Sequence, residues 1–190
     1  MSRLKLFLPL LIFVVAALLF TVILQKRETQ SADFLPSALI GKAFPAFSLP
    51  SLYANPANAD GNSGDAPAAR ILSDADLPGR TFLVNIWGTW CPECYREHGI
   101  LLELAEEGVP IVGINYKDER DKAEDYLARF DNPFVLNVFD SEGTLGLDLG
   151  VYGAPETFVV DSSGIIRERV AGGIDRAIWE QRLAPFFGSD

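Results

Sequence analysis

The two cysteines of the chain, Cys91 and Cys94, restrict its fold and chemistry more than any other feature. They are the only cysteines in 190 residues, and their spacing allows them to close a small disulfide ring. An apolar run at 81–87 precedes the pair, and a stretch with the apolar spacing of a helix, 93–107, follows it. A Cys-x-x-Cys pair between a strand and a helix indicates a redox-active dithiol, whereas the bare motif would be a weak signal.

The position of Cys91 at the start of the expected helix favours its thiolate form. Backbone N–H groups and the positive end of the helix dipole point at its sulfur. Cys94 lies one turn further in, so we expect it to be more buried and to stay a thiol. Pro92 suits the first turn because its missing N–H would have no partner there, while the charge of Glu93 opposes the dipole. The sequence therefore predicts that Cys91 attacks a disulfide and Cys94 resolves the mixed disulfide.

Other uses of such a pair find less support. A zinc site needs two further ligands, and the chain offers one histidine, His98, and no other cysteine. Haem attachment needs a histidine directly after Cys94, where Tyr95 stands. A purely structural disulfide would close a ring too small to constrain the unfolded chain much. We therefore expect no metal and no cofactor besides the Cys91–Cys94 disulfide.

Two further classes of protein remain as alternatives. A non-catalytic metallochaperone could use Cys91, Cys94 and His98 as ligands. A peroxidase is less favoured, because the pair suits dithiol exchange better than a lone peroxidatic thiolate.

The N-terminal part of the chain is typical of a membrane anchor. Residues 6–24 carry no charge, and a helix of that length spans about 28 Å, close to the hydrocarbon thickness of a bilayer. A cleaved signal peptide is the competing interpretation, but no small-x-small cleavage site follows residue 24. We predict a cytoplasmic N-terminus at 1–5, a transmembrane anchor at 6–24, a linker at 25–38 and a folded domain at 39–190.

The charge of the chain argues against nucleic acid as a partner. Acidic residues outnumber basic ones by 26 to 16, and the excess follows the apolar segment. The acidic side chains are spread along the sequence, so we expect them to lie on a solvated surface.

The order of the expected elements indicates one α/β domain with a central mixed β-sheet flanked by helices. Strands are predicted at 44–50 (an edge strand), 81–87, 109–116, 133–139, 157–160 and 165–170, the last two as a hairpin. Helices are predicted at 93–107, 118–130 and 174–187, with short turns of helix at 73–79 and 143–150 and a loop at 53–70. On the helix at 118–130 the expected inward residues are Ala123, Tyr126, Leu127 and Phe130.

Three segments of the sequence together resemble a known family. They are Gly88 to Cys94, the pair Glu97-His98, and the stretch Gly150 to Thr157, which contains Gly-Ala-Pro-Glu. They are similar to the membrane-anchored thiol:disulfide interchange proteins of cytochrome c maturation, the DsbE/CcmG type, which have the thioredoxin fold. The resemblance covers about residues 40–187 together with the anchor.

This resemblance implies a thioredoxin-like domain on the periplasmic side of the inner membrane, held there by a single span. It implies a reductant that keeps the haem-binding cysteines of apocytochrome c reduced and receives electrons from a membrane thiol donor. It also implies that Pro155 is a cis-proline beside Cys91 and Cys94. The remaining residues that the resemblance places around the site are Trp90, Pro92, Ala154, Glu97 and Glu156. A general membrane-anchored reductase with other clients is the alternative within the same fold.

The chain departs from thioredoxins at one buried position. Thioredoxins carry an aspartate six residues before the first cysteine, where this chain has Asn85, which cannot accept a proton. Acid–base function would then fall to Glu97, Glu156 or water. Glu97 lies near the inward side of the expected helix and could accept the proton of Cys94. His98 is expected to be a packed or partly exposed side chain.

Overall fold

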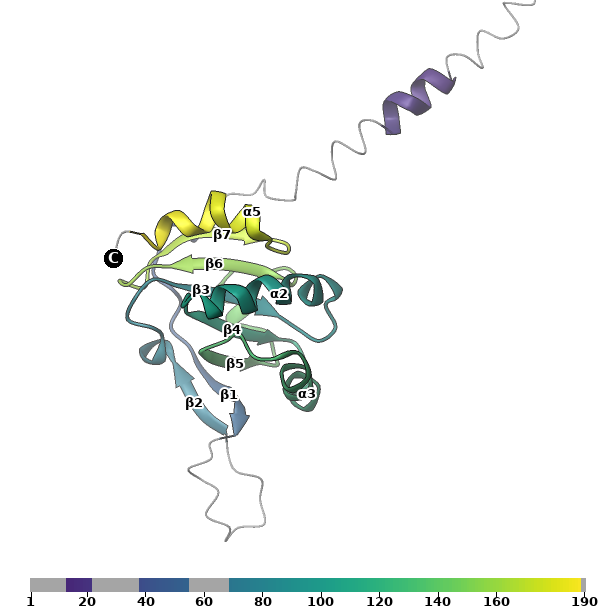
Figure 1. Cartoon of the computed structure of the whole chain (residues 1–190). Coiled ribbons are helices and arrows are strands. Elements are labelled where there is room, and N and C mark those ends of the chain that lie inside the picture. The colour runs from purple at the N-terminus through teal and green to yellow at the C-terminus, as the bar shows by residue number, and fades with distance from the viewer. Residues whose placement is uncertain (1–12, 22–37, 55–68, 189–190) are drawn as a thin grey trace, which may run out of the picture. The chain divides into compact units, whose positions relative to one another are not determined.

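The computed structural model describes residues 13–21, 38–54 and 69–188 (Figure 1). The chain divides into two compact units, Met1–Leu35 and Pro36–Asp190. In the first unit, residues 13–21 form a helix with exposed side chains. None of the helices within the described ranges is long and apolar enough to span a bilayer. The predicted anchor at 6–24 lies partly outside these ranges. The predicted N-terminal segment at 1–5 lies wholly outside them, and so does the predicted linker at 25–38 except for residue 38.

A seven-stranded mixed sheet forms the centre of the second unit, with the strand order β2-β1-β5-β4-β3-β6-β7 (Figure 1). The three central strands, β3 (Phe82–Trp87), β4 (Ile111–Tyr116) and β5 (Leu136–Asp140), are parallel. Antiparallel strands extend the sheet on both sides: β1 (Ser48–Ala54) and β2 (Ala69–Ser73) on one, β6 (Glu156–Val160) and β7 (Ile166–Ala171) on the other. The central mixed sheet and the late hairpin are as predicted.

The helical segments follow the predicted order. They are η2 (Asp74–Asp76), α2 (Pro92–Glu106), α3 (Arg120–Phe130), α4 (Thr144–Asp148), α5 (Arg176–Ile178), η3 (Trp179–Leu183) and η4 (Ala184–Phe186). The last three form one continuous segment that changes from α-helix to π-helix to 3-10 helix, where the sequence predicted a single helix at 174–187.

The apolar core has two parts, one on each face of the sheet. Strand β3 shows how they are separated, because successive side chains of a strand point to opposite faces. Leu83 and Trp87 pack with residues of α2, α3 and η3, whereas Phe82, Val84 and Ile86 pack with residues of α4. Asn85 lies between Val84 and Ile86, so its buried side chain points to the opposite face from theirs, the one that α2 covers.

The structure corrects two predictions about the sheet edge and α3. β1 pairs with both β2 and β5 and is therefore an interior strand, while β2, which the sequence analysis missed, forms the edge. β2 has only five residues, of which two are exposed, so it shows no clear alternation. Phe130 does not face inward, because as the last residue of α3 it is 46 % exposed, unlike the buried Tyr126.

Candidate active site

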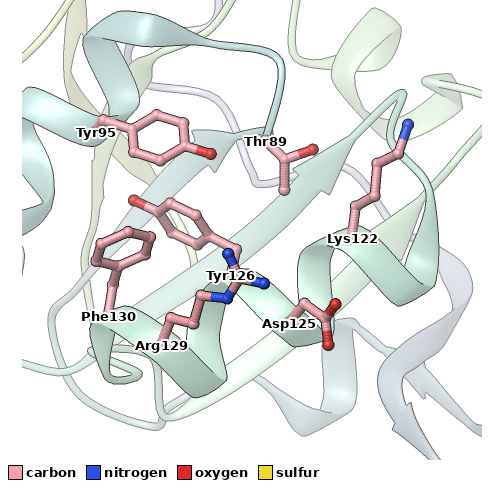
Figure 2. Close-up of a pocket in the computed structure, with 7 residues that line it drawn as sticks. All are labelled: Thr89, Tyr95, Lys122, Asp125, Tyr126, Arg129 and Phe130. Atoms are coloured by element: carbon pink, nitrogen blue, oxygen red, sulfur yellow. The ribbon is translucent and has the colours of Figure 1, made fainter.

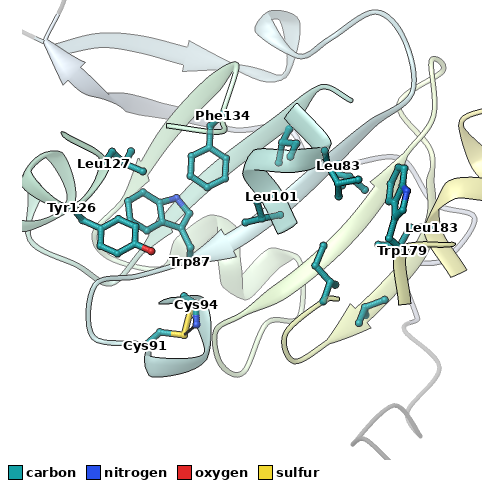
Figure 3. Packing of buried hydrophobic residues seen from close by; sticks show 14 of the residues in the cluster. Leu83, Trp87, Cys91, Cys94, Leu101, Tyr126, Leu127, Phe134, Trp179 and Leu183 are labelled. Carbon is teal, nitrogen blue, oxygen red and sulfur yellow. Dashed lines mark hydrogen bonds between the residues drawn. A yellow bond between two sulfur atoms is a disulfide. The ribbon is translucent and has the colours of Figure 1, made fainter. Parts of the chain in front are cut away.

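Cys91 and Cys94 are joined by a disulfide at the start of α2 (Figure 3). Cys91 is the N-cap residue, and the backbone N–H of Cys94 donates a hydrogen bond to its Sγ at 3.1 Å. Pro92 occupies the first turn, as predicted. After reduction, this N–H group and the helix dipole would stabilise a negative charge on the Cys91 sulfur. The local geometry therefore favours Cys91 as the nucleophile.

Both cysteines are buried, and the prediction that Cys94 would be the more buried of the two is wrong. Cys91 is 1 % exposed and Cys94 is 4 % exposed. Both belong to the apolar cluster between α2 and the sheet (Figure 3), and Ala154 packs against that cluster. A client sulfur that reaches Cys91 must therefore displace the groups that cover it.

The segment before Cys91 is fixed by hydrogen bonds to the connection between β4 and α3. The Thr89 backbone N–H and Oγ1 donate to the two carboxylate oxygens of Asp118 at 2.6 and 2.7 Å. The indole Nε1 of Trp90 donates to the Tyr116 carbonyl at 3.1 Å, and Trp90 is 49 % exposed. A Cβ at Gly88 would lie 2.6 Å from that Nε1, so only glycine permits this approach. Asp118 is a site residue that the sequence analysis missed.

The second predicted segment lies at the entrance to β6. The Ala154–Pro155 peptide bond is cis, as the resemblance implied. Pro155 is buried, whereas Tyr152 is 67 % exposed. Through Ala154, this segment borders the cluster that contains the disulfide.

Glu97 is a buried carboxyl on the same face of the sheet as the cysteines. Its Oε1 accepts a hydrogen bond from Asn85 Nδ2 and its Oε2 one from the Ile174 N–H, both at 2.9 Å. Burial raises the pKa of Glu97 to about 7, although these two hydrogen bonds act in the opposite direction. Glu97 and Cys94 line one narrow hollow that leaves no room for a water molecule. With this pKa, the carboxyl can change its protonation state near neutral pH.

Glu156 is also buried, but the structure does not bring it to Cys94. It lies two residues before Phe158 on β6 and so shares its face of the sheet, which carries the cluster on the side away from the cysteines. Its carboxylate forms an ion pair with Arg169 at 2.6 Å and accepts a hydrogen bond from the Tyr152 N–H at 3.3 Å. Burial raises the pKa of Glu156, and Arg169 partly offsets this effect. Of the two predicted acidic residues, only Glu97 lines the same small hollow as Cys94.

His98 is a packed side chain, in agreement with the sequence analysis. It is 7 % exposed, and its Nε2 lies 2.9 Å from the Phe130 carbonyl and 3.1 Å from that of Asp131. With two carbonyl partners, Nε2 is assigned as the protonated nitrogen. In the described part of the chain, no group of three or more His, Cys, Asp or Glu side chains is arranged to hold a metal ion.

A pocket of about 290 Å³ lies beside the start of α2 and was not predicted (Figure 2). The rings of Tyr95 from α2 and Tyr126 from α3 meet edge to face, with centroids 4.8 Å apart. Burial, with the nearby Tyr95, raises the pKa of Tyr126 to about 12, so its hydroxyl remains neutral. The other lining residues are Thr89, Lys122, Asp125, Arg129 and Phe130. Because Tyr95 follows Cys94 directly, the pocket borders the redox site.

Comparison with known proteins assigns a family to this arrangement. The family model called Redoxin matches residues 39–181. The chain is 48 % identical over 187 residues to the thiol:disulfide interchange protein DsbE of Pseudomonas aeruginosa, which covers 98 % of this chain and 94 % of the relative. It is 43 % identical over 188 residues to the protein of the same name from Escherichia coli (strain K12), with 98 % and 95 % covered.

Solved structures show the same fold at lower sequence identity. A secreted disulfide oxidoreductase of Mycobacterium tuberculosis superimposes with a TM-score of 0.58 at 19 % identity and covers 73 % of this chain and 95 % of its own. A thio-disulfide isomerase of Thermus thermophilus gives 0.59 at 24 % identity, with 80 % and 98 % covered. The thioredoxin-like fold predicted from the sequence is thus confirmed. With a cysteine pair at a helix start and near-complete alignment to such relatives, the chain belongs to the DsbE thiol:disulfide interchange proteins of the Redoxin family and is a thiol:disulfide oxidoreductase.

Proposed function

We propose that the chain is a periplasmic reductant, held in the inner membrane by residues 6–24, that reduces the disulfide between the haem-binding cysteines of apocytochrome c. The observation that carries its chemistry is the Cys91–Cys94 disulfide at the start of α2, with the buried carboxyl of Glu97 beside Cys94. The sequence resemblance described above supports the client, and the uncharged N-terminal run supports the anchor.

The proposed reaction is a two-electron exchange between the dithiol of the reduced protein and the disulfide of the client. The Cys91 thiolate attacks one sulfur of the client disulfide, which breaks that bond and releases the other client sulfur as a thiolate. Cys94 loses its proton to ionised Glu97 and attacks the Cys91 sulfur, which breaks the mixed disulfide and releases the second client sulfur as a thiolate. The protein is then oxidised, as in this structure, and a membrane dithiol donor reduces it again.

Client selectivity separates this proposal from a general reductase. The reduced full-length protein would be assayed on a peptide disulfide of the form Cys-x-x-Cys-His and on the same peptide with alanine in place of the histidine. We expect kcat/KM to be about tenfold higher for the first peptide, which corresponds to about 1.4 kcal/mol. Equal values for both peptides and for an unrelated disulfide would support the general reductase instead.

Trapping would identify the client directly. In Cys94→Ser the mixed disulfide at Cys91 cannot be resolved, so the natural client should remain attached. Cys91→Ser is the matched control and should trap nothing. Recovery of apocytochrome c is the expected result, whereas recovery of glutathione alone would contradict a dedicated client.

A further inference from the structure

Arg169 lies on β7, outside every motif found in the sequence, yet its guanidinium contacts the loop from Gly150 to Glu156. Its Nε donates to Glu156 Oε2 at 2.7 Å, and its Nη2 lies 2.6 Å from the same oxygen. Nη2 also donates to the Gly150 carbonyl at 3.1 Å. The side chain is only 12 % exposed, so these charge-assisted hydrogen bonds are largely shielded from water.

The same ion pair holds the middle of the loop. The Tyr152 N–H donates to the second oxygen of Glu156 at 3.3 Å, and the Arg169 guanidinium lies 5.4 Å from the centroid of the Tyr152 ring. The first, middle and last parts of the loop are thus connected through Arg169 and Glu156. Such a closed set of contacts fixes the loop more firmly than one hydrogen bond would.

Strand pairing places Arg169 where it can make these contacts. In the register of β6 and β7, Arg169 stands opposite Phe158, two residues after Glu156, and its guanidinium lies 5.6 Å from the Phe158 ring centroid. Residues two apart on a strand share a face, so the two charged side chains meet diagonally. The Arg169 carbonyl accepts a hydrogen bond from Arg182 at 3.0 Å, which ties this part of β7 to the C-terminal helix.

We propose that Arg169 is a positioning residue for disulfide exchange, which fixes the loop from Gly150 to Glu156 so that the exposed Tyr152 and the neighbouring Ala154 can receive the client polypeptide beside Cys91. The proposal rests on the thiol:disulfide exchange activity and holds for any polypeptide client, so it can fail while the assignment to apocytochrome c stands. Arg169 acts on client binding and leaves the reactivity of the Cys91 sulfur unchanged.

Two substrates of different size distinguish an effect of Arg169→Gln on client binding from an effect on the reactivity of the Cys91 sulfur. The reduced full-length variant is assayed with a disulfide-bonded peptide and with the small reagent 5,5′-dithiobis(2-nitrobenzoate). We expect KM for the peptide to rise about tenfold, with kcat and the rate constant for the small reagent unchanged, because one charge-assisted contact network is lost. The exposed Arg167→Gln on the same strand is the control and should leave KM unchanged. An unchanged KM in Arg169→Gln overturns the proposal.

A double variant distinguishes positioning from stability. Arg169→Gln alone leaves the Glu156 carboxylate buried without its cation, which lowers the unfolding midpoint. In Arg169→Gln with Glu156→Gln no buried charge remains, so the midpoint should recover while KM stays high. Arg169→Lys, which keeps the charge but not the forked geometry, should give an intermediate KM. Recovery of KM together with the midpoint in the double variant would show that Arg169 acts only through stability.

Discussion

Asn85 contacts Glu97, the buried carboxyl that the proposed mechanism uses as a proton acceptor. Its Nδ2 donates to Glu97 Oε1 at 2.9 Å and to Thr157 Oγ1 at 3.1 Å. In the proposed mechanism, Glu97 on α2, one turn after Cys94, would take the place of the carboxyl that thioredoxins carry on the strand, and the amide of Asn85 would orient it. Glu97 is one of the residues predicted from the sequence for this function, and its burial agrees with that prediction.

Glu97→Gln tests proton transfer at the resolving cysteine. Below a pH of about 7 the Glu97 carboxyl is protonated and cannot accept the Cys94 proton, so release of the client should accelerate as pH rises through that value. The variant should lose this inflection and release the client about 100-fold more slowly above it, the lower end of general-base effects. Rapid-mixing kinetics across pH would measure this. Glu106→Gln, an exposed position on α2, is the control, and an unchanged profile in Glu97→Gln would exclude the assignment.

The same carboxyl should make stability depend on pH. The pKa of Glu97 is raised from 4.5 to about 7 on folding, so between these values the native state binds a proton that the unfolded state releases. The unfolding free energy should therefore fall as pH rises through this window, by about 3 kcal/mol at most. Denaturant titrations should show a flatter pH dependence in Glu97→Gln. An equal slope in the wild type and the variant would contradict the raised pKa.

Among the structural elements, the connections before α2 and α3 form a unit through Asp118. Besides its bonds to Thr89, the carboxylate accepts a hydrogen bond from Asn115 Nδ2 at 3.0 Å. Donors from Thr89, in the connection before α2, and from Asn115, on β4, thus converge on one carboxylate, which places Trp90 and Cys91 relative to β4. The sequence shows Asp118 only as one acidic residue ahead of a helix.

Asp118→Ala should loosen the segment before Cys91. We expect a loss of about 2 kcal/mol of unfolding free energy, because hydrogen bonds to a charged, partly buried acceptor are removed. Asp118→Asn keeps one acceptor oxygen and should lose less. Denaturant unfolding would measure both, and equal stability of Asp118→Ala and the wild type would contradict this function of the carboxylate.

At the scale of the whole chain, we expect membrane attachment and redox activity to reside in different units, the first in Met1–Leu35 and the second in Pro36–Asp190. A variant that begins at residue 36 contains every residue of the site and should remain in solution with an unchanged kcat for a disulfide peptide. The full chain should stay with the membrane fraction after alkaline extraction, because the uncharged run at 6–24 can span the bilayer. Release of the full chain by that extraction would exclude an uncleaved anchor.

The sequence predicted the features that depend on local patterns. The strand before Cys91 and the helix after it follow from their apolar spacing, and Pro155 was found through its motif. Arg169 and Asp118 were missed, because their functions come from contacts with residues distant in sequence, which no local pattern reveals. The burial of Cys91 was mispredicted for a similar reason, since a residue at a helix start is covered or exposed according to what packs on it from elsewhere.

The ionisation of the reduced Cys91 thiol tests the account most directly. Thiolate absorbance would be titrated in the reduced protein, in Cys91→Ser and in Cys94→Ser. The N-cap position and the Cys94 N–H predict that Cys91 ionises first, with a pKa below the value of about 8.5 for free cysteine. A Cys91 pKa at or above that value, or a Cys94 thiol that ionises before it, would contradict the assignment of Cys91 as the attacking sulfur.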